Sequence, residues 1–323
     1  DADMRFVLAG QPNSGKSTIF NAVAGYRSAT ANFPGSSVSY TISRALIHGR
    51  EVEIVDLPGI YSLTSTAAIA GEAERYLLDG DYDLIIDIID ASRLGRSLEL
   101  TLQLLELRHP MVVALNQMDE AERRGVEVNL EELERRLGVP VVGTIGRRGQ
   151  GLKELFRKAL QTVHVGQPAG PLCLDREVED AVEAVVGILE DKGVKPGTPL
   201  RFAAGKLLER DPHFEEKIYG WYPSLADRVD SVVDDIEKAH GWTSDQVVSG
   251  GRHAVAHALE EEVATLQRPS VGWREWVDRF LLHPWTGGPL MVLILGGLFW
   301  MVFGVGQRLE VPLVALFERV STG

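Results

Sequence analysis

The residues of this sequence best suited to chemistry form the pattern G-x-x-x-x-G-K-S at Gly10–Ser17, between a short apolar run and a helix-like stretch. Such glycines let a loop direct its backbone N–H groups toward nucleotide phosphates. The lysine adds positive charge for the β- and γ-phosphates, and the serine offers its hydroxyl to Mg²⁺. The positive end of the following helix also favours anions. We therefore predict a phosphate-binding loop made of Gly10, Pro12, Asn13, Ser14, Gly15, Lys16, Ser17 and Thr18.

A second candidate group, Asp56-Leu-Pro-Gly59, ends a predicted strand. A carboxylate at this position can reach Mg²⁺ through water, and the backbone N–H of Gly59 can meet a γ-phosphate. The D-x-P-G pattern is weak by itself. Its position after the phosphate loop makes it a candidate for the metal and phosphate end of a nucleotide site.

A third group, Asn116-Gln-Met-Asp119, ends a later strand and can select a base. Asp119 can accept two hydrogen bonds, from guanine N1–H and N2–H₂, whereas adenine offers no such pair of donors. Alone, the N-x-x-D pattern would more often be a helix cap and turn. Its place in this order of motifs favours guanine recognition by Asn116, Gln117 and Asp119, with backbone contacts from Thr144, Ile145 and Gly146.

The elements that must position these residues alternate between strands and helices over residues 1–165. Runs such as 84–89 are almost entirely apolar, as in strands that are covered on both faces. We predict an α/β domain with a mostly parallel, six-stranded sheet and helices on both faces. One antiparallel edge strand is expected, because 39–47 and 51–56 are separated by three residues only. The six predicted strands are 5–9, 39–47, 51–56, 84–90, 111–116 and 139–144.

The rest of the chain has a different character. A linker rich in Gly and Pro begins at residue 166, and residues 166–270 show apolar spacing typical of helices and no strand pattern. We predict an all-α domain there, followed by a membrane-proximal segment and a first transmembrane span in 271–323. The span is expected at about 284–306, because that stretch has no charged residue and is long enough to cross a bilayer. A buried core helix or a groove-binding segment is the alternative.

Composition limits the classes of partner. The chain has 323 residues, 45% of them hydrophobic, and a net charge of −13. This acidity argues against nucleic-acid binding, which depends on neutralising phosphates with basic residues. The single cysteine, Cys173, excludes an internal disulfide and a cysteine-cluster metal site.

Taken together, the motifs resemble those of a TRAFAC-class GTPase. Within that class they are similar to the N-terminal cytosolic region of the bacterial ferrous iron transport protein B (FeoB) family. The resemblance rests on 10–21, Asn32-Phe-Pro-Gly35, 56–63, Asp90-Ala-Ser92, 100–107, 114–119 and Asp278-Arg-Phe-Leu-Leu-His-Pro284. It implies a Ras-like P-loop GTPase domain, then a helical domain similar to one described as inhibiting nucleotide dissociation. The implied activity is slow hydrolysis of GTP to GDP that regulates Fe²⁺ uptake.

The resemblance also implies cofactors and a location. Ser17, Ser37 and Asp56 would hold Mg²⁺, with Gly35, Ser36 and Ser37 forming the switch that senses the γ-phosphate; the choice between Ser36 and Ser37 as ligand stays open. Partners would be GTP or GDP and a membrane domain absent from this chain, and a homo-oligomer is an open option. The cellular location that the resemblance implies is the bacterial inner membrane. The arginines Arg268, Arg274 and Arg279 before the span place residues 1 to about 280 in the cytoplasm.

Catalysis is predicted from a missing residue. Ras-like enzymes carry a water-orienting glutamine just after D-x-x-G, whereas this chain has Ile60. Arg27 is the nearest candidate for an internal arginine finger. Similar proteins instead use K⁺ held by an asparagine that corresponds to Asn13, so the catalytic set is expected to be Asn13, Lys16 and Gly59. Departures from the family pattern are Ser37 for threonine, Gln117 for lysine, and Ile145-Gly146 for Ser-Ala.

Two rival functions remain open. One is a soluble, K⁺-dependent GTPase of ribosome assembly or tRNA modification, which would usually carry a basic RNA-binding domain. The other is a nucleotide sensor with negligible turnover. His253 and His257 share a helix face, but two ligands make only half of a metal site, and the sequence offers no obvious third. We therefore predict no metal site there.

Overall fold

The computed structural model describes residues 4–24, 28–32, 39–63, 68–166, 168, 170, 172–266, 277 and 280–321. The chain forms two units, Asp1–Pro269 and Ser270–Gly323, and each is described by itself. The phosphate loop, the base-reading segments and the helices that follow them belong to the first unit.

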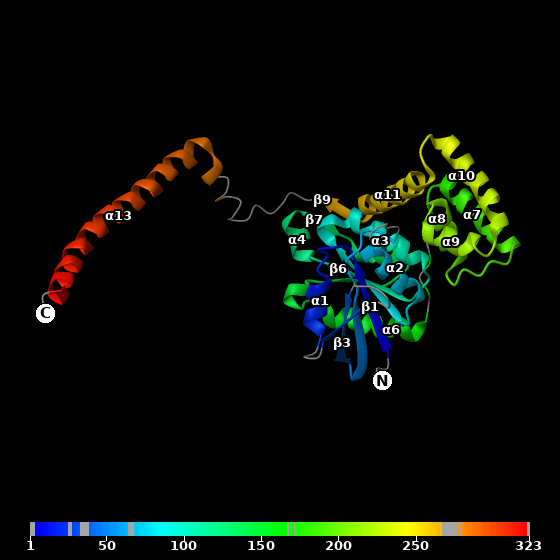
Figure 1. The fold of residues 1–323 in the computed structure, drawn as a ribbon, viewed down its shortest axis with the longest axis horizontal. Helices are drawn as coiled ribbons and strands as arrows, with labels where there is room; N and C mark the ends of the chain where they lie inside the picture. The colour runs from blue at the N-terminus through cyan, green and yellow to red at the C-terminus, as the bar shows by residue number, and fades with distance from the viewer. Residues whose placement is uncertain are drawn as a thin grey trace. The chain divides into compact units, whose positions relative to one another are not determined.

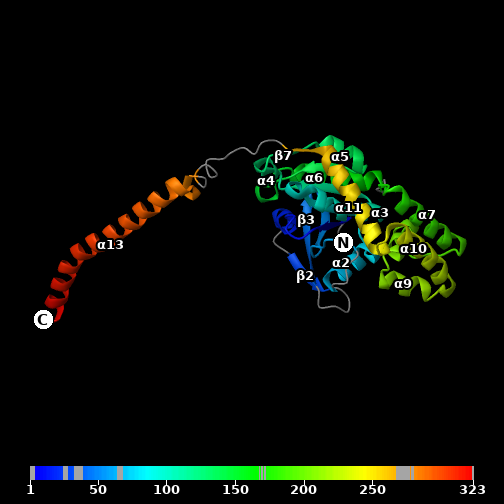
Figure 2. The ribbon, with the colours of Figure 1, turned by 90° about the horizontal axis from the view of Figure 1, so that it is seen from above.

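A seven-stranded sheet forms the centre of the first unit (Figures 1 and 2), with strand order β2-β3-β4-β1-β5-β6-β8. Strands β4, β1, β5, β6 and β8 pair in parallel, so their carboxyl ends share one edge. The strands are β1 (Met4–Gly10), β2 (Ser28–Asn32), β3 (Ser39–Ile47), β4 (Arg50–Asp56), β5 (Leu84–Asp90), β6 (Met111–Asn116) and β8 (Val141–Gly143).

The prediction of six strands and one antiparallel edge strand is wrong in two details. The seventh strand, β2, pairs antiparallel with β3, which itself runs antiparallel to β4. Strand β2 therefore takes the edge position expected for β3. Its sequence, Ser-Ala-Thr-Ala-Asn, has no large apolar side chain, so hydrophobic patterning gives no strand signal.

Helices cover both faces of the sheet, as predicted. In β1, Phe6 and Leu8 belong to one cluster of buried side chains, whereas Val7 and Ala9 belong to another. The first cluster includes side chains of α1 (Lys16–Val23) and α6 (Leu152–Val165). The second includes side chains of α2 (Ala68–Asp79), α3 (Leu94–Glu106), α4 (Met118–Arg123) and α5 (Leu130–Leu137).

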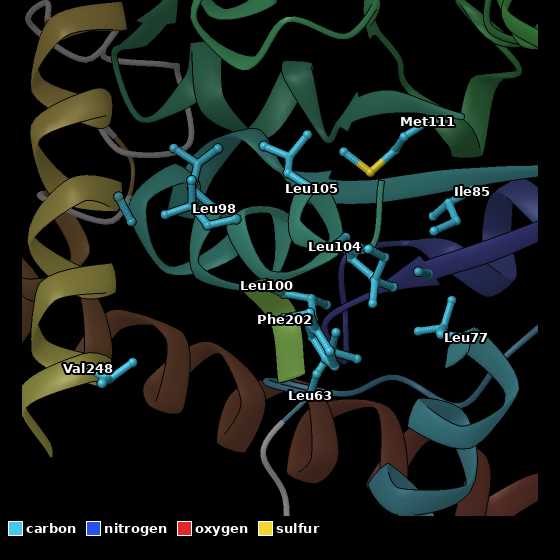
Figure 3. Close-up of a cluster of buried hydrophobic side chains, with 14 of the residues drawn as sticks. Leu63, Leu77, Ile85, Leu98, Leu100, Leu104, Leu105, Met111, Phe202 and Val248 are labelled. Carbon is cyan, nitrogen blue, oxygen red and sulfur yellow. The ribbon is translucent and has the colours of Figure 1, made fainter. Parts of the chain in front are cut away.

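The helical region does not build a separate core. Its buried side chains join the second cluster, and Figure 3 shows Phe202 of α8 lying against Leu63 and Leu100. Helix α9 was not predicted from the sequence, although it begins with Asp-Pro, a pair typical of helix starts. The Asp211 side chain accepts hydrogen bonds from two backbone N–H groups there. The helices are α7 (Arg176–Asp191), α8 (Leu200–Leu208), α9 (Pro212–Tyr219), α10 (Ala226–His240) and α11 (Ser244–Val263).

One strand interrupts the predicted all-α region. Strand β9 (Ala264–Leu266) follows α11 directly and pairs antiparallel with β7 (Val126–Val128). The backbone N–H of Asn129 also donates to the carbonyl of Val263 at 2.8 Å. The end of the helical region is thus tied to the segment that follows the base-reading motif.

The second unit contains α13 (Pro284–Ser321). Its window Trp285–Gly304 has a mean hydropathy of 1.8, and none of it is buried. Among the described residues, this is the one helix that is long enough and apolar enough to cross a membrane. The predicted span, 284–306, lies inside this helix, which continues beyond it.

Candidate functional site

The phosphate loop connects the end of β1 to the start of α1 in a path that requires glycine. Gly10 and Gly15 have φ values of 150° and 90°, a region that side chains disfavour. A Cβ at Gly10 would overlap the carbonyl oxygen of Ile88, and one at Gly15 would overlap the Asn116 amide. Tight packing against β5 and β6 therefore fixes the loop across the carboxyl edge of the sheet.

Lys16 and Ser17 both contact Asp56 at the end of β4. The Lys16 ammonium donates to Asp56 Oδ1 at 2.5 Å and to the carbonyl of Leu57. The Ser17 hydroxyl lies 3.3 Å from Asp56 Oδ2. The structure thus brings together three of the side chains predicted for phosphate and Mg²⁺, namely Lys16, Ser17 and Asp56.

Gly59 lies directly against the phosphate loop. A Cβ at Gly59 would come within 2.9 Å of the Pro12 nitrogen, so a larger residue would push the two segments apart. Ile60, the next residue, is 4% exposed and belongs to the core cluster. Its side chain is therefore committed to packing and has no polar group to orient water.

The side chain of Asn116 connects three parts of the site, because both of its polar atoms bond to other protein groups. Its amide donates to the carbonyl of Ser14 at 2.8 Å. Its Oδ1 accepts from the backbone N–H of Gly146 at 2.9 Å and from the Thr144 hydroxyl at 3.1 Å. Because Asn116 is only 2% exposed, these bonds stabilise the phosphate loop and the 144–146 loop together.

Gln117 adds a second bridge. Its amide donates to the carbonyl of Asn13 at 2.7 Å, and both residues have positive φ angles, 62° and 68°. These contacts place the side chain that replaces the usual lysine of N-K-x-D against the phosphate loop. Asn13 itself lines the cavity described next.

One cavity of about 550 Å³ collects most of the predicted residues. Gly10, Ser14, Asp56 and Thr144 do not line it but support the residues that do. Gly35, Ser36, Ser37 and Arg27 lie outside the described residues. The predicted residues that line the cavity are Pro12, Asn13, Gly15, Lys16, Ser17, Thr18, Gly59, Asn116, Gln117, Asp119, Ile145 and Gly146.

Three further residues line the cavity without having been predicted. Arg147 donates to the Asp119 carboxylate, Glu120 pairs with Arg123 and Arg124, and the Gln11 amide donates to the carbonyl of Arg96 at 2.6 Å. Hydrogen bonds from Arg123 and Arg124 lower the pKa of Glu120. Gln11 lies inside the Gly10–Ser17 motif, and Glu120 and Arg147 directly follow predicted residues, so whole motifs extended by one residue would have included all three.

The family described as "Ferrous iron transport protein B" matches residues 4–159, and the "FeoB cytosolic helical domain" matches residues 175–265. The cytosolic domain of L. pneumophila FeoB is 31% identical, with a TM-score of 0.70 over 81% of this chain and 99% of that chain. This chain belongs to the FeoB family.

Other FeoB proteins agree. An S. thermophilus NFeoB E67A mutant bound to GDP is 30% identical, with a TM-score of 0.73 over 81% of this chain and 100% of that chain. The Fe(2+) transporter FeoB of Salmonella typhimurium is 31% identical over 94% of this chain. This chain spans 39% of the length of that transporter.

In this FeoB-family chain, the segment after Gly59 is held by the helical region. Lys206 of α8 donates to the carbonyl of Leu63 at 2.6 Å. It also lies within 4 Å of three carboxylates, Glu74 at 3.5 Å, Glu209 at 3.5 Å and Asp211 at 3.8 Å. Burial raises the pKa of Glu74 to about 7, partly opposed by the positive charge of Lys206. Motif reading did not single out Lys206, because its partners Leu63 and Glu74 are distant in sequence.

Proposed function

We propose that this chain is the GTP-binding and GTP-hydrolysing regulatory module of a bacterial ferrous iron transporter. The observation that carries this proposal is that Lys16, Ser17 and Asp119 all line one cavity. Its volume, about 550 Å³, is in the range of small-molecule sites. Family membership and the GDP-bound S. thermophilus relative support the choice of nucleotide.

Two measurements on the purified chain test this function. Titration with GDP and ADP should show GDP binding at least about tenfold more tightly, because adenine lacks the paired donors that Asp119 would accept. Steady-state release of phosphate from GTP should be slow but measurable. Equal affinity for GDP and ADP would contradict guanine recognition, and binding without phosphate release would identify a sensor instead of an enzyme.

Mg²⁺ fits the donors at one end of the cavity. Ser17 Oγ and the Asp56 carboxylate are hard oxygen donors 3.3 Å apart. We propose that they hold Mg²⁺, with Ser37 completing the set. When bound, Mg²⁺ would neutralise charge on the β- and γ-phosphates. Lys16 and the backbone N–H of Gly59 would contribute hydrogen bonds to the same phosphates.

K⁺ is proposed as the second cation, held by Asn13. The support is the burial of Ile60, which leaves the position of the water-orienting glutamine without a polar side chain. A cation held by Asn13 would stabilise the charge that develops between the β- and γ-phosphates. GTP hydrolysis should be faster in KCl than in NaCl at equal ionic strength, and Asn13→Ala should abolish the difference. Equal rates in both salts would remove K⁺ from the mechanism.

The helical region is proposed to slow nucleotide release. The contact from Lys206 to the Leu63 carbonyl supports this role, because it restrains the segment that begins at Gly59. The rate of GDP dissociation should therefore rise in Lys206→Met. An unchanged rate would separate the helical region from nucleotide exchange.

We propose that α13 enters the bacterial inner membrane and that residues 1 to about 280 lie in the cytoplasm. The exposed apolar window Trp285–Gly304 supports membrane insertion. Truncation near Arg268 should give a soluble protein that still binds GTP, whereas the full chain should need detergent. A full chain that stays monomeric and monodisperse without detergent would favour the soluble ribosome-assembly or tRNA-modifying GTPase.

A further inference from the structure

A second cavity, of about 390 Å³, lies between the first turns of α3 and the middle of α11. Four of its lining side chains carry metal-binding groups: Glu99 of α3, and His253, His257 and Glu260 of α11. The three residues of α11 are spaced at i, i+4 and i+7, so they lie on one face of that helix. The spacing of the two histidines alone gives half of a metal site, and the fold adds Glu99 of α3 to it.

The distances between these groups suit a shared cation. His253 Nδ1 lies 2.7 Å from Glu99 Oε1. Two neighbouring ligands, each about 2.1 Å from one metal ion, are separated by about 3 Å. The rings of His253 and His257 have centroids 6.5 Å apart, and the Glu260 carboxylate lies against Gly95 in the first turn of α3.

We propose that this cavity binds one divalent first-row transition-metal ion, with His253, His257 and Glu99 as ligands and Glu260 beside them. Imidazole together with carboxylate is a donor set that such ions favour. No three described His, Cys, Asp or Glu side chains already converge on one point, so His257 must turn toward the other two. Its side chain is 58% exposed and makes a 3.6 Å contact to Glu261, which leaves room for that rotation.

The position of the site gives it a consequence beyond binding. Gln11 of the phosphate loop and Tyr61, just after Gly59, line the same cavity, and Gln11 also lines the nucleotide cavity. An ion bound here would fasten α11 to α3 beside both segments. Because coupling between two sites is reciprocal, any change that the metal makes in nucleotide affinity should be matched by an equal change that the nucleotide makes in metal affinity.

The test uses the untagged full chain in detergent, carrying Cys173→Ser to remove its thiol, with Mg²⁺ and GDP in excess to occupy the other cavity. Titration with Co²⁺, followed by calorimetry and visible absorption, should show one ion per chain. The double variant His253→Ala/His257→Ala should bind at least about tenfold more weakly. Fe²⁺ in large excess under anaerobic conditions should compete with Co²⁺, because sites of this kind generally bind Fe²⁺ less tightly than Co²⁺.

Matched variants separate a metal site from ordinary ion pairs. Glu99→Gln should weaken Co²⁺ binding, whereas Glu261→Gln and His213→Ala, which alter residues that do not line the cavity, should not. GDP binding by each variant checks that it is folded. Equal Co²⁺ affinity in the unsubstituted chain and the double histidine variant, or no bound Co²⁺ at all, would overturn the proposal and leave His253 and Glu99 as an interhelix ion pair.

Discussion

Two buried lysines contact the segment that follows β4, one near each end. Lys16 is 7% exposed and donates to the carbonyl of Leu57, and Lys206 is 3% exposed and donates to the carbonyl of Leu63. The residue type, the burial and the kind of backbone partner are alike. Their electrostatic surroundings differ.

Lys16 pairs with Asp56 and faces a cavity, so its charge is available to an anionic ligand. Lys206 lies among Glu74, Glu209 and Asp211, so its charge offsets carboxylates that already belong to the protein. Burying a charge is costly unless it is paired. The comparison indicates that Lys206 stabilises the junction with the helical region, whereas Lys16 serves a ligand.

The largest effect is expected at the structural lysine. Lys206→Met keeps the length of the side chain but leaves the surrounding carboxylates without their ammonium group. Removing one partner of a buried ion pair costs about 3–5 kcal/mol, so the free energy of unfolding should fall by that amount. Chemical denaturation measures it, and Lys192→Met, at an exposed lysine, is the control. A loss below about 1 kcal/mol would mean that Lys206 is not a structural centre.

The same substitution at Lys16 should act on binding instead. Lys16→Met should weaken GDP and GTP binding at least about 100-fold, because charge-assisted hydrogen bonds to phosphate are worth about 1.5–3 kcal/mol each. The unfolding free energy should change less than in Lys206→Met. Nucleotide titration checks this, with Lys153→Met as an exposed control. Unchanged nucleotide affinity would erase the distinction between the two lysines.

A smaller effect should appear in the pH dependence of stability. The pKa of Glu74 is raised to about 7 by burial, so its contribution to stability is present below about pH 4.5 and is lost as pH rises through 7. Glu74→Gln removes this titration. At pH 8 it should raise the free energy of unfolding by about 1–2 kcal/mol, whereas at pH 4.5 it should change little. A stabilisation that is equal at both pH values would show that Glu74 does not titrate in this range.

The two lysines also show what a sequence can predict. Lys16 sits in a contiguous motif whose strand and helix context is local, so its place in the cavity follows from spacing. Asp56 and Asp119 end parallel strands, and carboxyl ends of such strands meet at one edge. The sheet layers, the helices on both faces and the convergence of these groups could therefore be predicted from the sequence.

Features made by distant or weakly patterned segments could not be predicted. Lys206 meets Leu63 across 143 positions, and Glu99 meets His253 across 154. Strand β2 lacks large apolar residues, and β9 becomes a strand only because β7 offers it a partner. In each case the structure depends on a contact with a distant segment, and the residues nearby in sequence do not indicate that contact.

Recognition of guanine in the nucleotide cavity depends on Asp119, so a substitution of this residue tests the proposed ligand. Asp119→Asn exchanges a carboxylate oxygen for an amide donor, which reverses the hydrogen-bond pattern presented to the base. GDP affinity should fall at least tenfold, since a bidentate base contact is worth about 1–3 kcal/mol, and xanthosine diphosphate should bind better than it does to the unsubstituted chain. Unchanged GDP affinity in Asp119→Asn would contradict guanine recognition by Asp119, because the base would then be recognised elsewhere.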